Sequence, residues 1–137
     1  MKKNFRHTIC DPLQPNILKV GKVKRSRLVE LFEAHPWEVE LAKTLGVSEE
    51  EVHYAPSIEF ENVVTNRGMV VSAVGEPDDH RFHVFYKRPK ERRLLFGLIK
   101  QIDREYTTEL QDRSREETKV LLQALVERNW ILLEEKF

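Results

Sequence analysis

The sequence has few of the residues that cross-link a fold, end its helices and strands, or form flexible linkers. Among its 137 residues there are one Cys, five Gly and six Pro, and no repeat or low-complexity segment is visible. Because Cys10 is alone, an intrachain disulfide is excluded, which is typical of a cytoplasmic protein. No segment suits a long linker. We therefore expect an irregular N-terminal arm over residues 1–16, which contains Pro12 and Pro15, and a single α+β domain over residues 17–137.

Long apolar runs and net charge are also lacking. No run approaches the roughly 18 to 20 apolar residues of a membrane-spanning helix, so we expect no membrane partner. Lys and Arg together number 23, as do Asp and Glu, so no overall charge favours a polyanion. The charges are nevertheless segregated: residues 1–28 contain eight Lys or Arg and one Asp, whereas residues 29–62 contain one Lys and nine Glu. These blocks either pair with each other within the fold or form separate surface patches.

Residues suited to metal binding or catalysis are sparse. His7 and Cys10 are close in sequence, but no glycine-rich turn adjoins them to supply oxyanion donors. His80 and His83 differ by three positions, so they point to opposite faces of a regular strand and do not suit a shared metal ion. No glycine-rich phosphate-binding loop is present. We therefore expect no metal and no cofactor, and we favour a protein without enzymatic activity; these four residues are the reactive groups available if it is an enzyme.

Local patterns predict short elements in the first half of the chain. Residues 17–23 alternate apolar residues with lysine or glycine, which suits an edge strand. Three short helices in tandem are expected next, each with a capping or proline signal at its start or end: residues 26–36, 36–45 and 48–55.

The second half of the chain predicts a sheet followed by helices. Alternating residues predict three strands, around 58–61, 69–74 and 82–87, which short turns join into an antiparallel meander. Apolar residues at helical spacing then predict two longer amphipathic helices, over about 90–106 and 114–129. The expected fold is therefore α+β, with N-terminal short helices, a three-stranded antiparallel meander, and two longer C-terminal amphipathic helices on one sheet face.

Residues 38–55, EVELAKTLGVSEEEVHYA, carry the pattern of a helix-turn-helix. Ala42 suits a close approach of two helices, and Gly46 suits a turn with positive φ. With the hairpin after it, the order of elements resembles that of winged-helix DNA-binding domains. The resemblance implies base readout by the second helix, yet residues 49–51 are three glutamates, which phosphates repel. We interpret the segment as a structural helical hairpin with an acidic cap.

The leading functional hypothesis is a non-catalytic protein-binding module, such as a regulator, an adaptor, or an inhibitor or immunity-type protein. The acidic block supports it, because a charged patch accelerates encounter with a partner of opposite charge. The expected partner is another protein with a basic surface. The candidate contact residues are Glu49, Glu50, Glu51, Glu59 and Glu61.

The alternative is a winged-helix-like nucleic-acid-binding protein. It would use the N-terminal basic block, the tip of the predicted hairpin and the basic run over residues 87–93 to contact phosphates. If His83 and Phe85 faced solvent, the sheet would add a surface on which bases could stack. The candidate contact residues are Lys24, Arg25, Arg27, Arg67, Lys87, Arg88, Lys90, Arg92 and Arg93.

Overall fold

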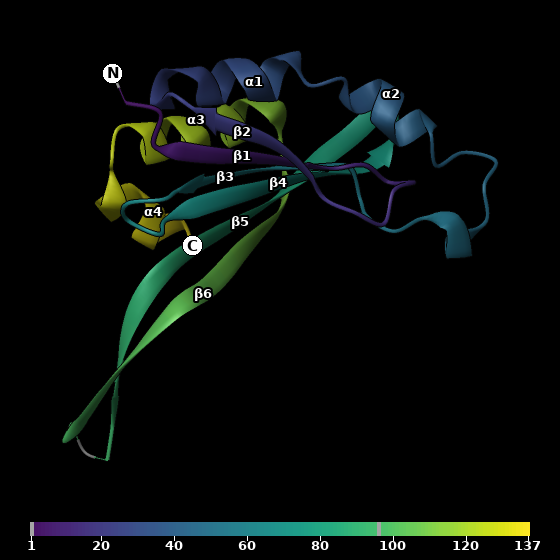
Figure 1. The fold of residues 1–137 in the computed structure, drawn as a ribbon. Helices are drawn as coiled ribbons and strands as arrows, with labels where there is room; N and C mark the ends of the chain where they lie inside the picture. Colours follow the sequence, from purple (N-terminus) through teal and green to yellow (C-terminus); the bar gives the residue numbers. More distant parts are fainter. Residues whose placement is uncertain (1, 96) are drawn as a thin grey trace.

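A computed structural model describes residues 2–95 and 97–137, and for residues 92–94 it describes the backbone alone. Six antiparallel strands form one sheet in the order β2-β1-β3-β4-β5-β6 (Figure 1). In chain order the elements are β1 (Phe5–Cys10), β2 (Leu18–Val23), the 3-10 turn η1 (Arg25–Arg27), α1 (Leu28–Ala34), α2 (Trp37–Ala42), the 3-10 turn η2 (Glu49–Glu51), β3 (Ser57–Asn62), β4 (Gly68–Glu76), β5 (Asp79–Leu94), β6 (Ile99–Arg113), α3 (Arg115–Val126) and α4 (Trp130–Lys136).

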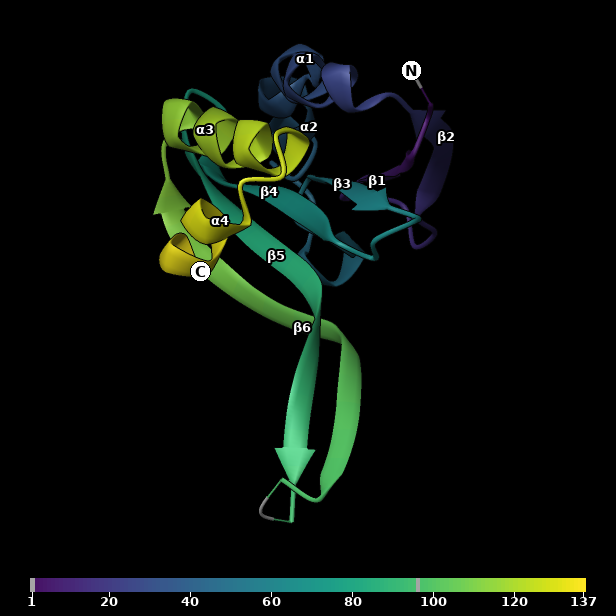
Figure 2. The same ribbon diagram turned by 90° about the vertical axis from the view of Figure 1, so that its left-hand side faces the viewer.

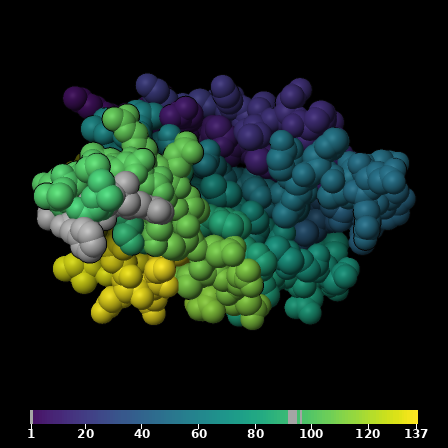
Figure 3. Space-filling view, turned by 90° about the horizontal axis from the view of Figure 1, so that it is seen from below, coloured from purple at the N-terminus to yellow at the C-terminus, as the bar shows by residue number. Residues whose placement is uncertain are grey.

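The four α-helices pack on one face of the sheet. The strands turn alternate side chains to that face, so Phe82, Val84 and Tyr86 are at most 1% exposed, while His83 and Phe85 on the opposite face are half-buried. Seen from below, the green atoms of β5 and β6 lie between the yellow C-terminal residues and the purple N-terminal residues (Figure 3). No helix among the described residues is long and apolar enough to cross a membrane.

The expected three-stranded meander was wrong, because those strands are the middle of a six-stranded sheet. Residues 5–10 fall within the predicted irregular arm, but they form β1, which hydrogen-bonds to β2 on one side and β3 on the other. The two prolines that suggested an irregular arm lie in the loop after the strand. The predicted edge strand over residues 17–23 is present as β2 at the sheet margin.

The predicted helix over residues 90–106 was also wrong, because this stretch forms the end of β5, a turn and β6. Its apolar residues have helical spacing, but a helix here would have no core to cover, and continued pairing with β5 satisfies the backbone instead. Leu95 and Gly97 have φ of +52° and +86°, values suited to the tight turn. We call residues 88–106, which lie beyond the last pairing with β4 at Lys87, the arm; it projects away from the helices (Figures 1 and 2).

The second predicted C-terminal helix is present as α3, so the chain has one long C-terminal helix rather than two. Ser114 caps it: its side chain accepts from the amide of Glu117, whose carboxylate accepts from the Ser114 amide. The chain then turns at Arg128, which has φ of +57°, into the short helix α4.

The separately predicted helix over residues 26–36 is present as α1, and the helix-turn-helix pattern over residues 38–55 predicted α2 but not the structure of the segment after it. Gly46 has φ of +77°, as the turn requires. The segment expected as the reading helix is only the 3-10 turn η2, and Ala42 is exposed rather than packed between helices. Because β3 and β4 are interior strands of the sheet, the hairpin is not the free wing of a winged helix.

Two histidines should make folding sensitive to mild acid. His7 is 4% exposed and stacks on Phe60, and the half-buried His35 has an Nε2 atom without a partner among the described residues. Burial lowers the pKa of both imidazoles. The unfolded chain therefore binds more protons as pH falls through the ordinary histidine range, which stabilises the unfolded state.

We expect the melting temperature to fall between pH 7.5 and pH 5.5, a window above the titration of the carboxylates. The variant His7→Phe/His35→Phe should show a flatter pH dependence, because neither phenylalanine can take up a proton. Thermal unfolding followed by circular dichroism at both pH values checks this. An equally steep dependence in the variant would show that these histidines are not responsible.

Candidate functional site

The strand register separates the two charge blocks. Phe5 pairs with Val23 and Asn62, and Gly68 pairs with Lys87, so the residues just beyond these positions gather at one end of the sheet. We call this end, with its exposed or half-buried cations, the basic end: Lys2, Lys3, Lys22, Lys24, Arg25, Arg27, Arg67 and Arg128.

The opposite end of the sheet carries acidic residues. Cys10 pairs with Ser57 there, and the amide of His53 donates to the carbonyl of Pro12 at 2.8 Å, which holds the segment containing η2 at this end. We call it the acidic end, with the exposed residues Glu49, Glu50, Glu51, Glu76, Asp78 and Asp79. The first two charge blocks of the sequence therefore do not simply cancel within the fold.

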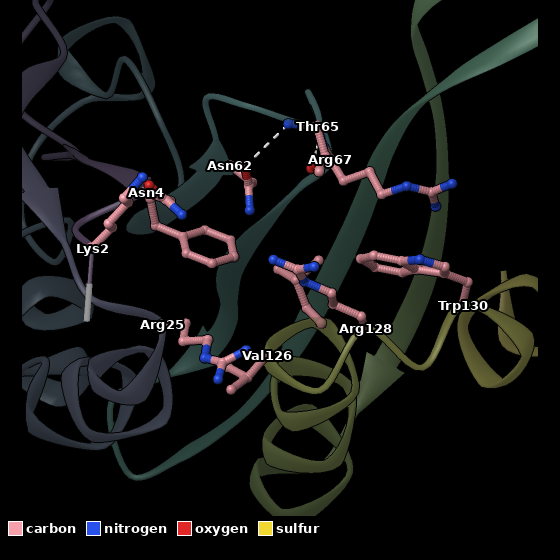
Figure 4. A pocket seen from close by; sticks show the side chains of 11 residues that line it. Lys2, Asn4, Arg25, Asn62, Thr65, Arg67, Val126, Arg128 and Trp130 are labelled. Carbon is pink, nitrogen blue, oxygen red and sulfur yellow. Dashed lines mark hydrogen bonds between the residues drawn. The ribbon is translucent and has the colours of Figure 1, made fainter.

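A pocket of about 210 Å³ opens at the basic end (Figure 4). Its described lining includes four cationic side chains and no carboxylate. Such a site attracts anions, because each cation raises the electrostatic potential felt by the others. The lining residues are Lys2, Asn4, Phe5, Arg25, Asn62, Thr65, Arg67, Leu125, Val126, Arg128 and Trp130.

The turn between β3 and β4 forms one wall of the pocket. The Asn62 side-chain oxygen accepts from the amides of Val64 and Thr65 at 2.9 and 3.1 Å. This directs the amide nitrogen of Asn62 into the pocket, where it is a neutral donor (Figure 4). Asn66 then adopts φ of +58°, a conformation that asparagine tolerates, and Arg67 comes next.

Arg67 is held in place by aromatic residues. Its guanidinium lies 4.3 Å from the centre of the Trp130 ring and donates to the Tyr86 hydroxyl. These contacts tie the β3–β4 turn to α4 and β5. Arg67 therefore presents its charge from a fixed position, with less rotational freedom to lose on binding an anion.

The other three cations come from separate segments. Arg25 lies on η1, Arg128 on the link between α3 and α4, and Lys2 precedes β1. None of the three makes an ion pair with a described residue. Their charges are therefore available to a ligand.

A shallow groove of about 470 Å³ continues the cationic surface. It shares chain segments with the pocket, since Lys3 adjoins Lys2 and Lys24 adjoins Arg25. Its lining residues are Lys3, Lys22, Val23, Lys24, Ser26, Arg27 and Leu31. Among the described residues, Arg27 alone of these cations is paired, at 3.0 Å from Glu30.

The predicted nucleic-acid residues fall into three groups. Arg25 and Arg67 line the pocket, and Lys24 and Arg27 line the groove. The remaining residues lie on β5 or at the root of the arm, and they are Lys87, Arg88, Lys90, Arg92 and Arg93.

The residues of the basic run on β5 have different environments. Lys87 pairs with Glu61, and Arg88 is 5% exposed. The ammonium of Lys90 lies 4.3 Å from the centre of the Tyr106 ring. The side chains of Arg92 and Arg93 lie outside the described residues.

Three residues of the pocket, Lys2, Arg128 and Trp130, were not predicted from the sequence. Lys2 lies in the N-terminal segment, residues 1–16, that was predicted to be irregular. Arg128 and Trp130 lie at the end of a predicted helix. No local pattern distinguishes them from ordinary surface residues. Their shared position results from the register of β1 against β3 and from the turn between α3 and α4.

The predicted acidic patch is spread over two places. Glu49, Glu50 and Glu51 are exposed on η2, and none makes an ion pair with a described residue. Glu61 lies on β3 between Arg6, at 2.9 Å, and Lys87. Glu59 accepts a hydrogen bond from Thr8 at 3.2 Å.

The reactive residues considered from the sequence are dispersed. Burial raises the pKa of the Cys10 thiol, which disfavours the nucleophilic thiolate at neutral pH. His7 is buried against Phe60, whereas His80 lies at the other end of the sheet, 3.1 Å from the carbonyl of Pro77. The described residues contain no group of three or more His, Cys, Asp or Glu placed to hold a metal ion.

No protein-family model, curated protein or solved structure was found to match this chain.

Arg88 should prove structural rather than ligand-binding. Its guanidinium donates to Glu134 at 3.1 and 3.2 Å and to Thr108 at 2.6 Å, and it lies 4.6 Å from the centres of the Tyr86 and Tyr106 rings. We expect Arg88→Gln to lower the free energy of unfolding by about 2 kcal/mol, because it removes charge-assisted hydrogen bonds. The exposed control Lys90→Gln should change it by less than about 0.5 kcal/mol. Urea denaturation measures both, and equal values would contradict a structural role.

Proposed function

We propose that the protein binds nucleic acid through the phosphate backbone at its basic end. The supporting observation is the pocket in which Lys2, Arg25, Arg67 and Arg128 converge without a carboxylate in the described lining. Arginine suits phosphate, because the guanidinium donates two parallel hydrogen bonds to its oxygens.

The groove beside the pocket favours an extended polyanion over a small anion. Lys3, Lys22 and Lys24 continue the cationic surface away from the pocket. A single phosphate in the pocket would leave these lysines unused, whereas a nucleic-acid backbone presents phosphates at regular intervals to both the pocket and the groove. Each neutralised phosphate also releases condensed counterions, which adds to the affinity at low salt.

The composition of the site favours contacts with the phosphate backbone of a nucleic acid over recognition of its bases. Its charged groups are Lys and Arg, and Asn62 already uses its side-chain oxygen to hold the turn. The indole of Trp130 is covered on one face by Arg67, so at most one face remains for a base to stack upon. Binding at the basic end is therefore expected to be weakly sequence-dependent.

The acidic end supports a second candidate function, recognition of a basic protein. Glu49, Glu50 and Glu51 form an exposed acidic turn with no ion pair to a described residue. Glu59 and Glu61 add less to this surface, because Glu61 is already paired with Arg6 and Lys87. This candidate therefore rests on η2 rather than on the whole predicted acidic patch.

The variant Arg25→Gln/Arg128→Gln should weaken binding of a labelled single-stranded oligonucleotide by about 10- to 100-fold at low salt, because it removes two phosphate contacts. The slope of log affinity against log salt concentration should become shallower by about 1.4. Fluorescence anisotropy over a salt series measures both. The matched control is Lys19→Gln/Lys136→Gln, which removes two charges that do not line the pocket or groove. Equal loss in both variants would contradict a defined site.

The acidic end should bind a short oligolysine peptide at a rate that falls as salt is added. The variant Glu49→Gln/Glu50→Gln/Glu51→Gln should associate about tenfold more slowly, because steering depends on local charge. The control Glu105→Gln/Glu127→Gln/Glu135→Gln removes the same number of charges elsewhere. Stopped-flow anisotropy compares the rates, and an association rate insensitive to salt would exclude this candidate.

A further inference from the structure

The arm extends well beyond the body of the protein. β5 continues for seven residues past Lys87, from Arg88 to Leu94, or about 23 Å at the rise of an extended strand. Among the described strands, only β6 pairs with it there. A two-stranded ribbon is marginally stable alone in water, so a partner that holds the arm would supply stabilisation that the fold does not.

The root of the arm adjoins the basic pocket. Gly68, at the start of β4, pairs with Lys87, and the pocket residue Arg67 donates to Tyr86 on the same strand. Figure 1 shows the arm inclined toward the end of the molecule that carries the N-terminus. A ligand bound at the basic end therefore lies beside the base of the arm.

The arm combines positive charge with an exposed apolar end. Residues 88–106 contain six Lys or Arg and three Asp or Glu. Near the far end four large aliphatic side chains are exposed: Leu95 by 64%, Leu98 by 85%, Ile99 by 46% and Ile102 by 61%. Such a group in water marks a surface that is covered by a partner.

We propose that the arm enters the major groove of a DNA duplex whose backbone is held at the basic end, with Leu95 and Leu98 against thymine methyl groups. This inference rests on the proposed function and names duplex DNA as its ligand. The major groove is about 12 Å wide and admits a two-stranded ribbon, whereas a single strand has no groove to receive the arm.

The chemistry of the groove explains why a basic ribbon would end in leucines. Phosphates line both margins of the groove and attract the exposed cations of the arm, such as Lys90, Lys100 and Arg104. The thymine methyl is the apolar group that base edges present there, and aliphatic side chains contact it. Bases carrying no methyl group would leave the leucines against polar edges.

Replacing thymine by deoxyuracil tests this contact, because it removes the methyl group and keeps the base pair. The protein should bind an A·T-rich duplex at least about threefold more tightly than the same duplex containing deoxyuracil. The variant Leu95→Ser/Leu98→Ser should lose that discrimination and bind the thymine duplex about as weakly as the protein binds the deoxyuracil duplex. It should keep its affinity for a single-stranded oligonucleotide, because the basic pocket is unchanged.

The matched control is Val39→Ser/Val120→Ser, which removes two aliphatic side chains, 60% and 56% exposed, from α2 and α3 rather than from the arm. It should bind both duplexes as the unmodified protein does. Since Leu95 and Leu98 are exposed, both variants should melt at the temperature of the unmodified protein, and melting curves check this.

The outcomes separate this inference from the proposed function. If Arg25→Gln/Arg128→Gln affects neither nucleic acid, the proposed function fails and the inference fails with it. A second result is that single-strand binding depends on the pocket. The inference alone then fails if the leucine variant still prefers the thymine duplex, or if the unmodified protein shows no such preference. The inference is also overturned if Leu95 and Leu98 are needed for binding to anionic lipid vesicles or for self-association in sedimentation, but not for duplex binding.

Discussion

The pairing register of β5 determines where the basic pocket and the arm lie relative to each other. Its first half pairs with both β4 and β6 and buries Phe82, Val84 and Tyr86 beneath the helices. Its second half pairs with β6 alone and becomes the arm. The change occurs at Lys87, where β4 begins at Gly68, so the pocket and the arm meet at one point of the sheet. A β-carbon at position 68 would lie 2.6 Å from the carbonyl oxygen of Phe60, so glycine fits where larger residues would force strands apart.

The net charge is zero, but the basic end and the acidic end are electrostatically independent surfaces. The six residues of β1 span about 20 Å between the ends of the sheet. The Debye length at physiological ionic strength is about 8 Å, so neither end strongly feels the charge of the other through solvent. Pairs such as Arg6 with Glu61 neutralise charge locally, between strands, and leave the ends unbalanced. A neutral chain can thus favour an anion at one end and a cation at the other.

The sequence was informative wherever neighbouring residues determine the structure. The alternation around Phe82 and the helix that begins after Ser114 each belong to one element, and both were predicted correctly. The arm was mistaken for a helix because Leu95, Leu98 and Ile102 have helical spacing, and spacing alone does not reveal whether a core exists to cover them. The pocket could not be predicted from local patterns, since its four cations come from four segments that meet only through strand register.

Local departures from ordinary folding preferences gather around the proposed ligand surface. Of the four described residues other than glycine with positive φ, Asn66 adjoins the pocket, Arg128 lines it and Leu95 lies near the far end of the arm. Leucine and arginine are disfavoured in this conformation, and cations without counter-ions repel one another. Exposed leucines add a further cost in water. Natural sequences retain such conflicts where function compensates for them, and a single anionic partner at this end would relieve the charge repulsion and cover the leucines together.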